Sequence, residues 1–340
     1  MQTIEISAEN AGRRLDKFLF QYFNEAPHSF IYKMLRKKRI KLNGARAQGG
    51  ELLQAGDSLA MYLSPETIAA FRKARVAEKA GRLRDIVYED QHLLVVNKPV
   101  GMPSHGGMSR AGDKNGDKNN EHLLAQVLYY LQESGAYDPS AAFVPALCNR
   151  LDVNTGGLVI CGKTIHALQE MNALFANRGV DKEYLAVADG VLGEAGENCL
   201  LEGLYRKDTR NNTAVIFPRK TLAPTPDIRH ISGPDISAVT EYKVLAVSYD
   251  RKHTLVSVNP VTGRSHQIRA HLASIGYPLS GDKKYGGKPI SCAAAQLLHC
   301  HRLSISHSKS LASLQYLAGK TWEASLPEGF ARFVEENFPK

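Results

Sequence analysis

Residues 149–160 read NRLDVNTGGLVI. Arg150 and Asp152 stand two positions apart, so in an extended segment their side chains leave the backbone on the same side. Gly156 and Gly157 allow another backbone or a ligand to come close, because glycine has no side chain and tolerates positive φ. The apolar residues that follow predict a buried strand. The stretch therefore predicts a functional loop that is held rigidly at the start of a core strand.

The tripeptide itself is not specific, since Arg14-Leu15-Asp16 repeats it near the N-terminus. There the apolar residues recur at helical spacing, and we expect Asp16 to be a solvated carboxylate on a helix surface. What distinguishes Asp152 is its surroundings, because only the second copy precedes a glycine pair and a strand.

The first 63 residues predict a small separate unit. Apolar residues at helical spacing predict one helix from Leu15 to Phe23 and a second that begins at an N-cap Ser29. The sequence Asn43-Gly44 is a strong hairpin signal. Basic residues gather on and after the second helix, where they could follow a phosphate backbone or form a solvated helix face. The predicted RNA-binding residues are Arg13, Lys33, Arg36, Lys37, Lys38, Arg39 and Lys41.

Residues 64–84 are rich in Ala, Lys and Arg and read as a linker, followed by a larger domain over residues 85–340. In this domain long strands follow one another, with helices inserted irregularly. That order predicts an α+β fold with a mixed, mostly antiparallel central sheet flanked by helices. The stretch from Met108 to Asn120 has nothing to bury, and we expect a mobile surface loop there rather than an RNA-contacting flap.

The chain has 43 lysine and arginine residues against 34 aspartate and glutamate residues, a formal net charge of +9. This charge favours a polyanionic partner, with nucleic acid as the first expectation. We find neither an apolar run of membrane-spanning length nor a secretory signal, and expect a cytoplasmic protein without membrane attachment. The cysteines and histidines of residues 292–301 do not follow the spacing of a structural zinc site, so no metal is expected.

Further motifs occur in order along the larger domain. They are Val96-Asn97-Lys98-Pro99-Val100-Gly101 with His105, Lys182-Glu183-Tyr184-Leu185-Ala186, the stretch from Pro260 through Arg264-Ser265-His266-Gln267-Ile268-Arg269 to Leu272, and Gly281-Asp282 with Lys284-Tyr285-Gly286. With Arg150-Leu151-Asp152 they resemble the RluA/RluC-type pseudouridine synthase family over residues 86–330. Gly156 and Ser265 stand where that family usually has Ser and Thr. Residues 12–63 resemble the alpha-L RNA-binding module.

The resemblance implies a pseudouridine synthase fold and an isomerase that needs no cofactor. Asp152 is then the catalytic carboxylate, Arg269 its cationic partner, and Tyr184 a platform for a flipped uracil. Arg150 is expected to brace the gap that the flipped base leaves. Further substrate contacts are expected from Asn97, Lys98 and Gln267, whereas His266, His271 and His299 are interpreted as residues that orient loops.

The chemistry of the reaction agrees with this assignment. Pseudouridine formation breaks the N1–C1′ bond of uridine and joins C5 to C1′. An ionised Asp152 could attack C1′ or act as a base at the sugar, and the sequence does not decide between them. A carboxylate in a closed apolar pocket needs a fixed cation to stay charged, and the planar fork of Arg269 can hold it with two hydrogen bonds.

Large-subunit ribosomal RNA is the expected substrate, with transfer RNA as the chief alternative, and the protein is expected to act as a monomer. Two other classes compete with this reading. One is a structured-RNA-binding protein without catalysis, and the other is a nucleosidase or glycosidase. A retaining glycosidase uses a second carboxylate as general acid, for which the sequence offers no matching residue.

Overall fold

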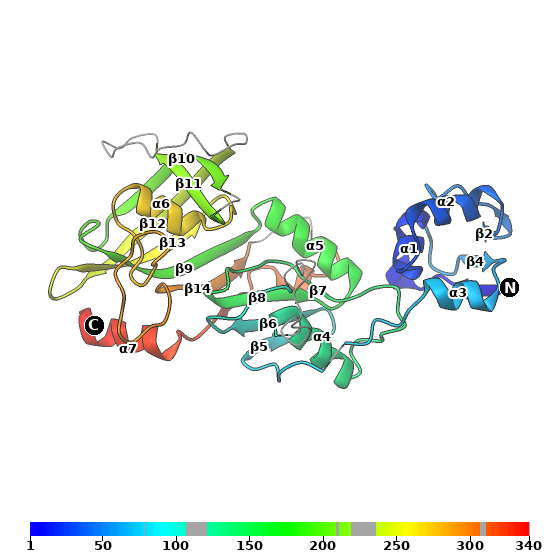
Figure 1. Ribbon diagram of the computed structural model, residues 1–340, viewed down its shortest axis with the longest axis horizontal. Helices are drawn as coiled ribbons and strands as arrows, with labels where there is room; N and C mark the ends of the chain where they lie inside the picture. Colours follow the sequence, from blue (N-terminus) through cyan, green and yellow to red (C-terminus); the bar gives the residue numbers. More distant parts are fainter. Residues whose placement is uncertain (78, 107–120, 209–210, 219–235, 307–310, 340) are drawn as a thin grey trace.

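The computed structural model describes residues 1–77, 79–106, 121–208, 211–218, 236–306 and 311–339. The segment from Met108 to Asn120, expected to be a surface loop, lies outside the described residues. Figure 1 shows an elongated molecule, with a small N-terminal unit in blue at one end and a large sheet domain that occupies the rest.

The N-terminal unit combines short helices with a small antiparallel sheet. The strands run in the order β1-β4-β2-β3. The elements are β1 Gln2–Glu5, η1 Ala8–Asn10, α1 Leu15–Tyr22, α2 His28–Arg36, β2 Ile40–Leu42, β3 Ala45–Arg46, β4 Ser58–Met61 and α3 Pro65–Phe71. Apolar side chains from both long helices and the sheet, among them Leu19, Ile31 and Leu59, form its buried core.

The expected helix pair and hairpin are present, with one local difference. Asn43 and Gly44 both have positive φ, 50° and 74°, as a two-residue hairpin turn requires. The second helix begins at His28 with Pro27 in the N-cap position, so the prediction of Ser29 as N-cap is wrong. Proline fixes an extended φ there without donating a hydrogen bond, and this already sets the chain for the first helical turn.

Helix α3 belongs to the N-terminal unit, although the sequence analysis assigned it to the linker. Ser64 caps it by accepting from Thr67 N. The ring of Phe71 packs on Phe30 with centroids 4.4 Å apart. The chain then runs along residues 137–142, where Arg75 N–H donates to Pro139 O at 2.9 Å. The packed unit therefore extends to Phe71 rather than ending at residue 63.

The large domain is built on one mixed sheet. Its elements are β5 Ile86–Glu89, β6 Leu93–Lys98, α4 Leu123–Glu133, β7 Ala146–Leu147, β8 Gly156–Gly162, α5 Ile165–Ala176, β9 Val180–Asp189, β10 Asn198–Asp208, β11 Thr213–Pro218, β12 Ile236–Val247, β13 His253–Pro260, α6 Gln267–Ser274, β14 Leu298–Ile305, η3 Gln315–Leu317, β15 Thr321–Glu323 and α7 Glu328–Asn337. The strand order is β11-β10-β12-β13-β9-β14-β8-β6-β5, with β15 beside β14 and β7 beside β8.

Among the described strands only β8 and β14 pair in parallel, so the predicted α+β fold with a mostly antiparallel sheet is confirmed. Helices α4 and α5 lie beside the half of the sheet that contains β8, whereas α6 packs on the half that contains β12 and β13 (Figure 1). The two halves meet where β9 pairs with β14. No helix in the described part of the chain is long and apolar enough to span a membrane.

Candidate active site

The loop that carries Asp152 leads into β8, at the junction of the two sheet halves, and is fixed through its backbone on both sides. Before Asp152, the buried Ser104 hydroxyl donates to Leu151 O at 2.8 Å and accepts from Leu151 N at 3.1 Å. After it, Val153 O accepts from Gly101 N at 2.9 Å and from Lys98 Nζ at 3.2 Å. The motif from Val96 to Gly101 therefore holds the main chain of the Asp152 loop, through Lys98 and Gly101.

The glycine pair allows β14 to approach closely. Gly157 has φ 116°, and a Cβ on it would lie 2.3 Å from Cys300 O, so no other residue fits. At Gly156 a Cβ would lie 2.9 Å from Nδ1 of the buried His299. The serine that the related family usually has here would therefore require the His299 ring to move in this chain.

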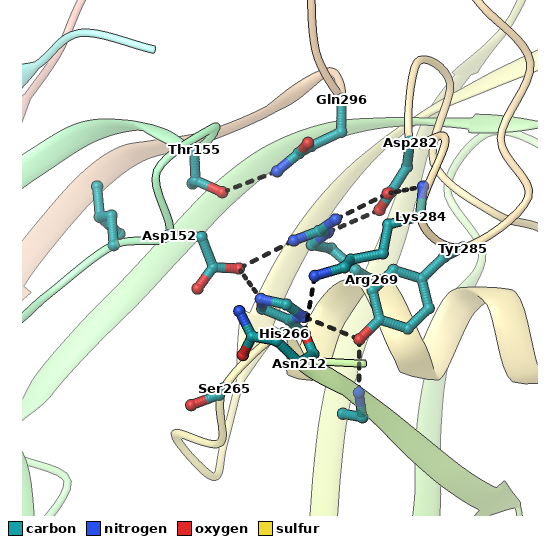
Figure 2. Close-up of polar contacts among 12 residues, drawn as sticks. Asp152, Thr155, Asn212, Ser265, His266, Arg269, Asp282, Lys284, Tyr285 and Gln296 are labelled. Atoms are coloured by element: carbon teal, nitrogen blue, oxygen red, sulfur yellow. Dashed lines mark hydrogen bonds and ion pairs between the residues drawn. The ribbon is translucent and has the colours of Figure 1, made fainter. Parts of the chain in front are cut away.

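The Asp152 carboxylate makes its contacts through one oxygen (Figure 2). Oδ2 lies 3.3 Å from Arg269 Nη1 and 3.7 Å from His266 Nε2. The side chain is 29% exposed. No described residue bonds to Oδ1, so this oxygen is available to a substrate.

The predicted pairing of Arg269 with Asp152 is present, but the prediction that its fork holds Asp152 is wrong. The two-pronged contact goes to Asp282, with Nε to Oδ2 at 2.7 Å and Nη2 to Oδ1 at 2.8 Å. Asp282 is fully buried and takes the bidentate edge of the guanidinium, which leaves Nη1 for Asp152. Burial opposes the charge of Arg269, yet Asp282 and then Asp152 raise its pKa above the ordinary value.

Asp152 separates two cavities. The first, of about 530 Å³, is lined by Tyr184, Phe175 and Leu298 together with cationic side chains that include Arg178 and Lys182. The second, of about 590 Å³, is lined by lysines 207, 283 and 284 together with His105. Arg150 and Asp152 line both. Two cavities with basic side chains in their walls therefore meet at one carboxylate, and the first also offers an aromatic wall.

Tyr184, the expected uracil platform, and Arg150, the expected brace, both line the first cavity together with Asp152. Burial raises the pKa of Tyr184 well above its ordinary value, and the neighbouring Cys300 and Asp152 act in the same direction. The hydroxyl therefore stays protonated at neutral pH. Arg150 is exposed, and its only described polar contact is a long one, 3.5 Å, to Ser265 Oγ.

Three residues predicted to contact substrate are instead occupied by the protein. Gln267 is buried, and its amide accepts from Thr262 Oγ1 and Arg264 N and donates to Val239 O and Thr240 Oγ1. Asn97 donates to Ser325 O at 3.2 Å and lines neither cavity. Lys98 is completely buried and donates to three carbonyl groups, those of Pro99, Met102 and Val153. Gln267 lines the first cavity with its amide already bonded to the protein, and Asn97 and Lys98 line neither cavity.

The burial of Lys98 has an electrostatic consequence. Burial lowers its pKa to about 8, although the charge of Asp152 acts in the opposite direction. Two histidines near the site are also buried, and burial lowers the pKa values of His271 and His299 to about 4. Both rings are therefore neutral at pH 7.

Most of the predicted RNA-binding residues are exposed. Arg36, Lys37, Lys38 and Arg39 are exposed at the end of α2, as is Lys33. None of them forms an ion pair with another described residue. Lys41 lies over the ring of Tyr62, 5.3 Å from its centroid.

Arg13 and Asp16 are corrections to the sequence analysis, because both are buried. Arg13 donates to Asn10 Oδ1 at 2.7 Å and to Gln21, and is structural rather than available to RNA. Asp16 is 2% exposed and accepts from Arg14, Lys17 N and Tyr32. These bonds, that of Arg14 first, lower its pKa against the opposing effect of burial.

Asp282 and Tyr285 are site residues whose roles the sequence analysis missed. Tyr285 Oη lies 2.9 Å from His266 Nδ1 and accepts from Ala214 N at 2.8 Å. The signal was their position in a motif after Arg269, in a segment with many glycines. In the part of the chain that the structure describes, no group of three or more His, Cys, Asp or Glu residues could hold a metal ion.

Comparison with known proteins agrees with this geometry. The family described as RNA pseudouridylate synthase matches residues 92–274, more than half of the chain. The chain is 30% identical to ribosomal large subunit pseudouridine synthase C of Vibrio vulnificus, over 90% of this chain and 89% of that protein. It is 29% identical to ribosomal large subunit pseudouridine synthase D of Pseudomonas aeruginosa, over 96% of this chain and 92% of that protein.

A solved structure shares the fold. Human RNA pseudouridylate synthase domain containing 4 superposes with a TM-score of 0.52 at 23% identity, over 74% of this chain and 92% of that one. The matched residues include Asp152, Tyr184 and Arg269, and the relatives match the chain over nearly its full length. The chain therefore belongs to the RNA pseudouridylate synthase family.

Proposed function

We propose that the protein converts uridines of large-subunit ribosomal RNA to pseudouridine, with Asp152 as the catalytic carboxylate. The observation that carries the proposal is the position of Asp152 between two cavities, with Oδ2 directed to Arg269 and Oδ1 without a partner among the described residues. A carboxylate that is anchored through one oxygen can present the other to a reacting atom.

The reaction is an isomerisation, so atoms and electrons balance without a co-reactant. The N1–C1′ bond breaks and uracil leaves with the bonding pair, while Asp152 either adds to C1′ or removes a proton from the sugar. After the uracil turns, C5 bonds to C1′ while Asp152 either leaves C1′ as a carboxylate or returns its proton to the sugar. The proton on C5 is then lost and N1 is protonated, which restores the uracil ring as an isomer of the starting nucleoside.

The first cavity is the proposed site of the uracil. Its volume of about 530 Å³ lies within the range of sites that hold small ligands, and Tyr184 offers an aromatic face for stacking. Because Tyr184 keeps its proton, we expect its hydroxyl to act as a donor rather than as a base.

The second cavity is the proposed path of the RNA backbone next to the flipped nucleotide. Lys207 and Lys283 are exposed at its wall, and ammonium groups attract phosphate. Arg150 lines both cavities and is well placed to fill the gap in the stack. The exposed basic residues of α2 would hold a more distant part of the same RNA.

The choice of ribosomal RNA is supported by the relatives, whose names place their activity on the large ribosomal subunit. Transfer RNA is the alternative substrate. A protein that only binds structured RNA and a nucleosidase are alternatives from other classes. We also expect a monomer that acts in the cytosol.

The test is product analysis with purified protein. Large-subunit ribosomal RNA and transfer RNA, both lacking pseudouridine, are incubated separately with the protein, digested to nucleosides and analysed by mass spectrometry after derivatisation specific for pseudouridine. We expect pseudouridine in the ribosomal RNA. Pseudouridine only in transfer RNA would overturn the proposed substrate, whereas free uracil or RNA binding without product would overturn the proposed reaction.

A further inference from the structure

A row of polar groups leads from the main chain of β11 to the catalytic carboxylate. Ala214 N–H donates to Tyr285 Oη at 2.8 Å, and Tyr285 Oη lies 2.9 Å from His266 Nδ1. His266 Nε2 in turn lies 3.7 Å from Asp152 Oδ2. Figure 2 shows the contacts that join Tyr285, His266 and Asp152 in succession, beside the separate contact of Arg269 with the same Asp152 oxygen.

The first group in the row favours one direction for the others. A backbone N–H can only donate, so Tyr285 Oη is an acceptor toward Ala214. Burial raises the pKa of Tyr285 to about 12, so the hydroxyl keeps its proton at neutral pH. That proton is free to point at His266 Nδ1, which then accepts. A neutral imidazole that accepts at Nδ1 carries its proton on Nε2, the nitrogen that faces Asp152.

The backbone of His266 is also unusual. It adopts a left-handed conformation with φ 55° and ψ 19° at the N-cap of α6, without a side-chain capping bond. A residue with a Cβ rarely adopts this region, and such conformations gather at functional sites. The ring instead packs edge-on against Tyr285, with centroids 5.8 Å apart and an interplanar angle of 84°. The backbone thus directs the imidazole into the site rather than onto the helix end.

We propose that His266 is a positioning residue that donates its Nε2–H to Asp152 Oδ2, and that Tyr285 fixes the tautomer required for this. The proposal rests on the proposed catalytic role of Asp152. Arg269 and His266 then hold the same oxygen from two directions and leave Oδ1 to the substrate. The 3.7 Å separation is longer than a hydrogen bond, and we expect it to shorten once RNA closes the site, as catalytic contacts often do.

Several charged groups surround His266 and influence its pKa. Asp152 comes from the catalytic loop, Arg269 from α6 itself, and Asp282, Lys284 and Tyr285 from the loop after it. Burial lowers the pKa of His266, Arg269 and Lys284 add to this, and the two carboxylates oppose it. A hydroxyl that donates to Nδ1 stabilises the neutral ring, so its removal should raise the pKa of His266.

The test is ¹⁵N NMR of histidine-labelled protein, without RNA, across a pH titration. In the wild type we expect the His266 resonances, assigned by their loss in His266→Gln, to show the Nε2–H tautomer. In Tyr285→Phe we expect a mixture of tautomers and a pKa raised by about 0.5 or more, a change that corresponds to the loss of one weak to moderate hydrogen bond. Tyr277→Phe is the control, because Tyr277 has no described contact with His266 and should leave the titration unchanged.

A kinetic measurement provides a second readout. Under single-turnover conditions with saturating RNA, we expect Tyr285→Phe and His266→Leu to lower the rate by about tenfold without changing RNA affinity, and His266→Gln to recover part of the loss through its amide N–H. An Nδ1–H tautomer in the wild type, or a His266 titration unchanged by Tyr285→Phe, would overturn the proposal. Because the NMR experiment contains no RNA, its result is independent of whether pseudouridine is the product.

Discussion

Replacement of Arg269 by lysine tests how much of the site depends on a forked cation rather than on positive charge. The guanidinium reaches two carboxylates at once, with two bonds of 2.7 and 2.8 Å to Asp282 and one of 3.3 Å to Asp152. Lysine has a single nitrogen on a flexible stem and can contact one carboxylate well. Arg269→Lys should therefore leave either Asp282 or Asp152 without its partner.

The magnitude follows from burial. The side chains of Arg269 and Asp282 are only 7% and 1% exposed, and breaking a buried pair of this kind costs about 3–5 kcal/mol of unfolding free energy. If the lysine stays with Asp282, Asp152 loses one charge-assisted hydrogen bond, worth about 1.5–3 kcal/mol. A loss of that size in the transition state lowers the rate by about 10- to 100-fold.

Arg302→Lys is the matched control. Arg302 also bridges two carboxylates, with 2.7 Å to Glu323 and 2.9 Å to Glu183, but its side chain is 41% exposed. An exposed pair is worth about 0–1 kcal/mol, so this variant should be nearly as stable and as active as the wild type. Urea unfolding gives the stability, single-turnover pseudouridine formation the rate, and filter binding the RNA affinity. Our reasoning is refuted if Arg269→Lys matches Arg302→Lys in stability and rate, or if it loses RNA affinity while its single-turnover rate is normal.

Three further outcomes are expected. Joint replacement of Arg36, Lys37, Lys38 and Arg39, at and just after the end of α2, should lower the log–log slope of the salt dependence of RNA binding by about two to four, without a change in the single-turnover rate at saturating RNA; an unchanged slope would mean that RNA is held elsewhere. Asp16→Asn should lower the unfolding free energy by about 1–3 kcal/mol at pH 7, because Asp16 is buried and accepts several bonds, and the difference from wild type should shrink as the pH falls below about 4. Lys98 has a pKa of about 8 against an ordinary 10.5, so the unfolded protein binds this proton more tightly than the folded protein does. As the pH rises from 8 to 10.5, the unfolding free energy of the wild type should therefore increase by about 3 kcal/mol relative to that of Lys98→Met. A difference between the two proteins that does not change with pH would contradict the burial of a charged Lys98.

Features that depend on local sequence could be predicted. The Asn43-Gly44 turn needs two residues with positive φ, and those residue types announce it. The loop before β8 could be predicted because a glycine pair and an apolar strand follow Asp152 directly. The order of the motifs then brought Tyr184 and Arg269 to the same site, through the family resemblance and not through periodicity.

Features that depend on contacts distant in sequence could not be predicted. Arg269 and Asp282 lie on different elements, and nothing in their spacing says which carboxylate takes the fork. Gln267 and Lys98 carry polar groups of the kind that bind substrate, but burial and protein partners use all of that capacity. Asp16 was expected to be solvated because its helix is amphipathic, whereas its carboxylate is buried and accepts hydrogen bonds from Arg14 and Tyr32. In each case the identity of the partner, not the residue type, decides the role.

The most direct test of the whole account is Asp152→Asn, prepared free of deamidated protein. The substitution keeps the size of the side chain and removes its charge, so RNA affinity should stay near normal while single-turnover formation of pseudouridine falls by about 10⁴-fold or more, as for other residues at the centre of a reaction. Asp250→Asn, in an exposed turn, is the matched control and should be fully active. Pseudouridine formed by Asp152→Asn at a rate near that of the wild type would contradict the account.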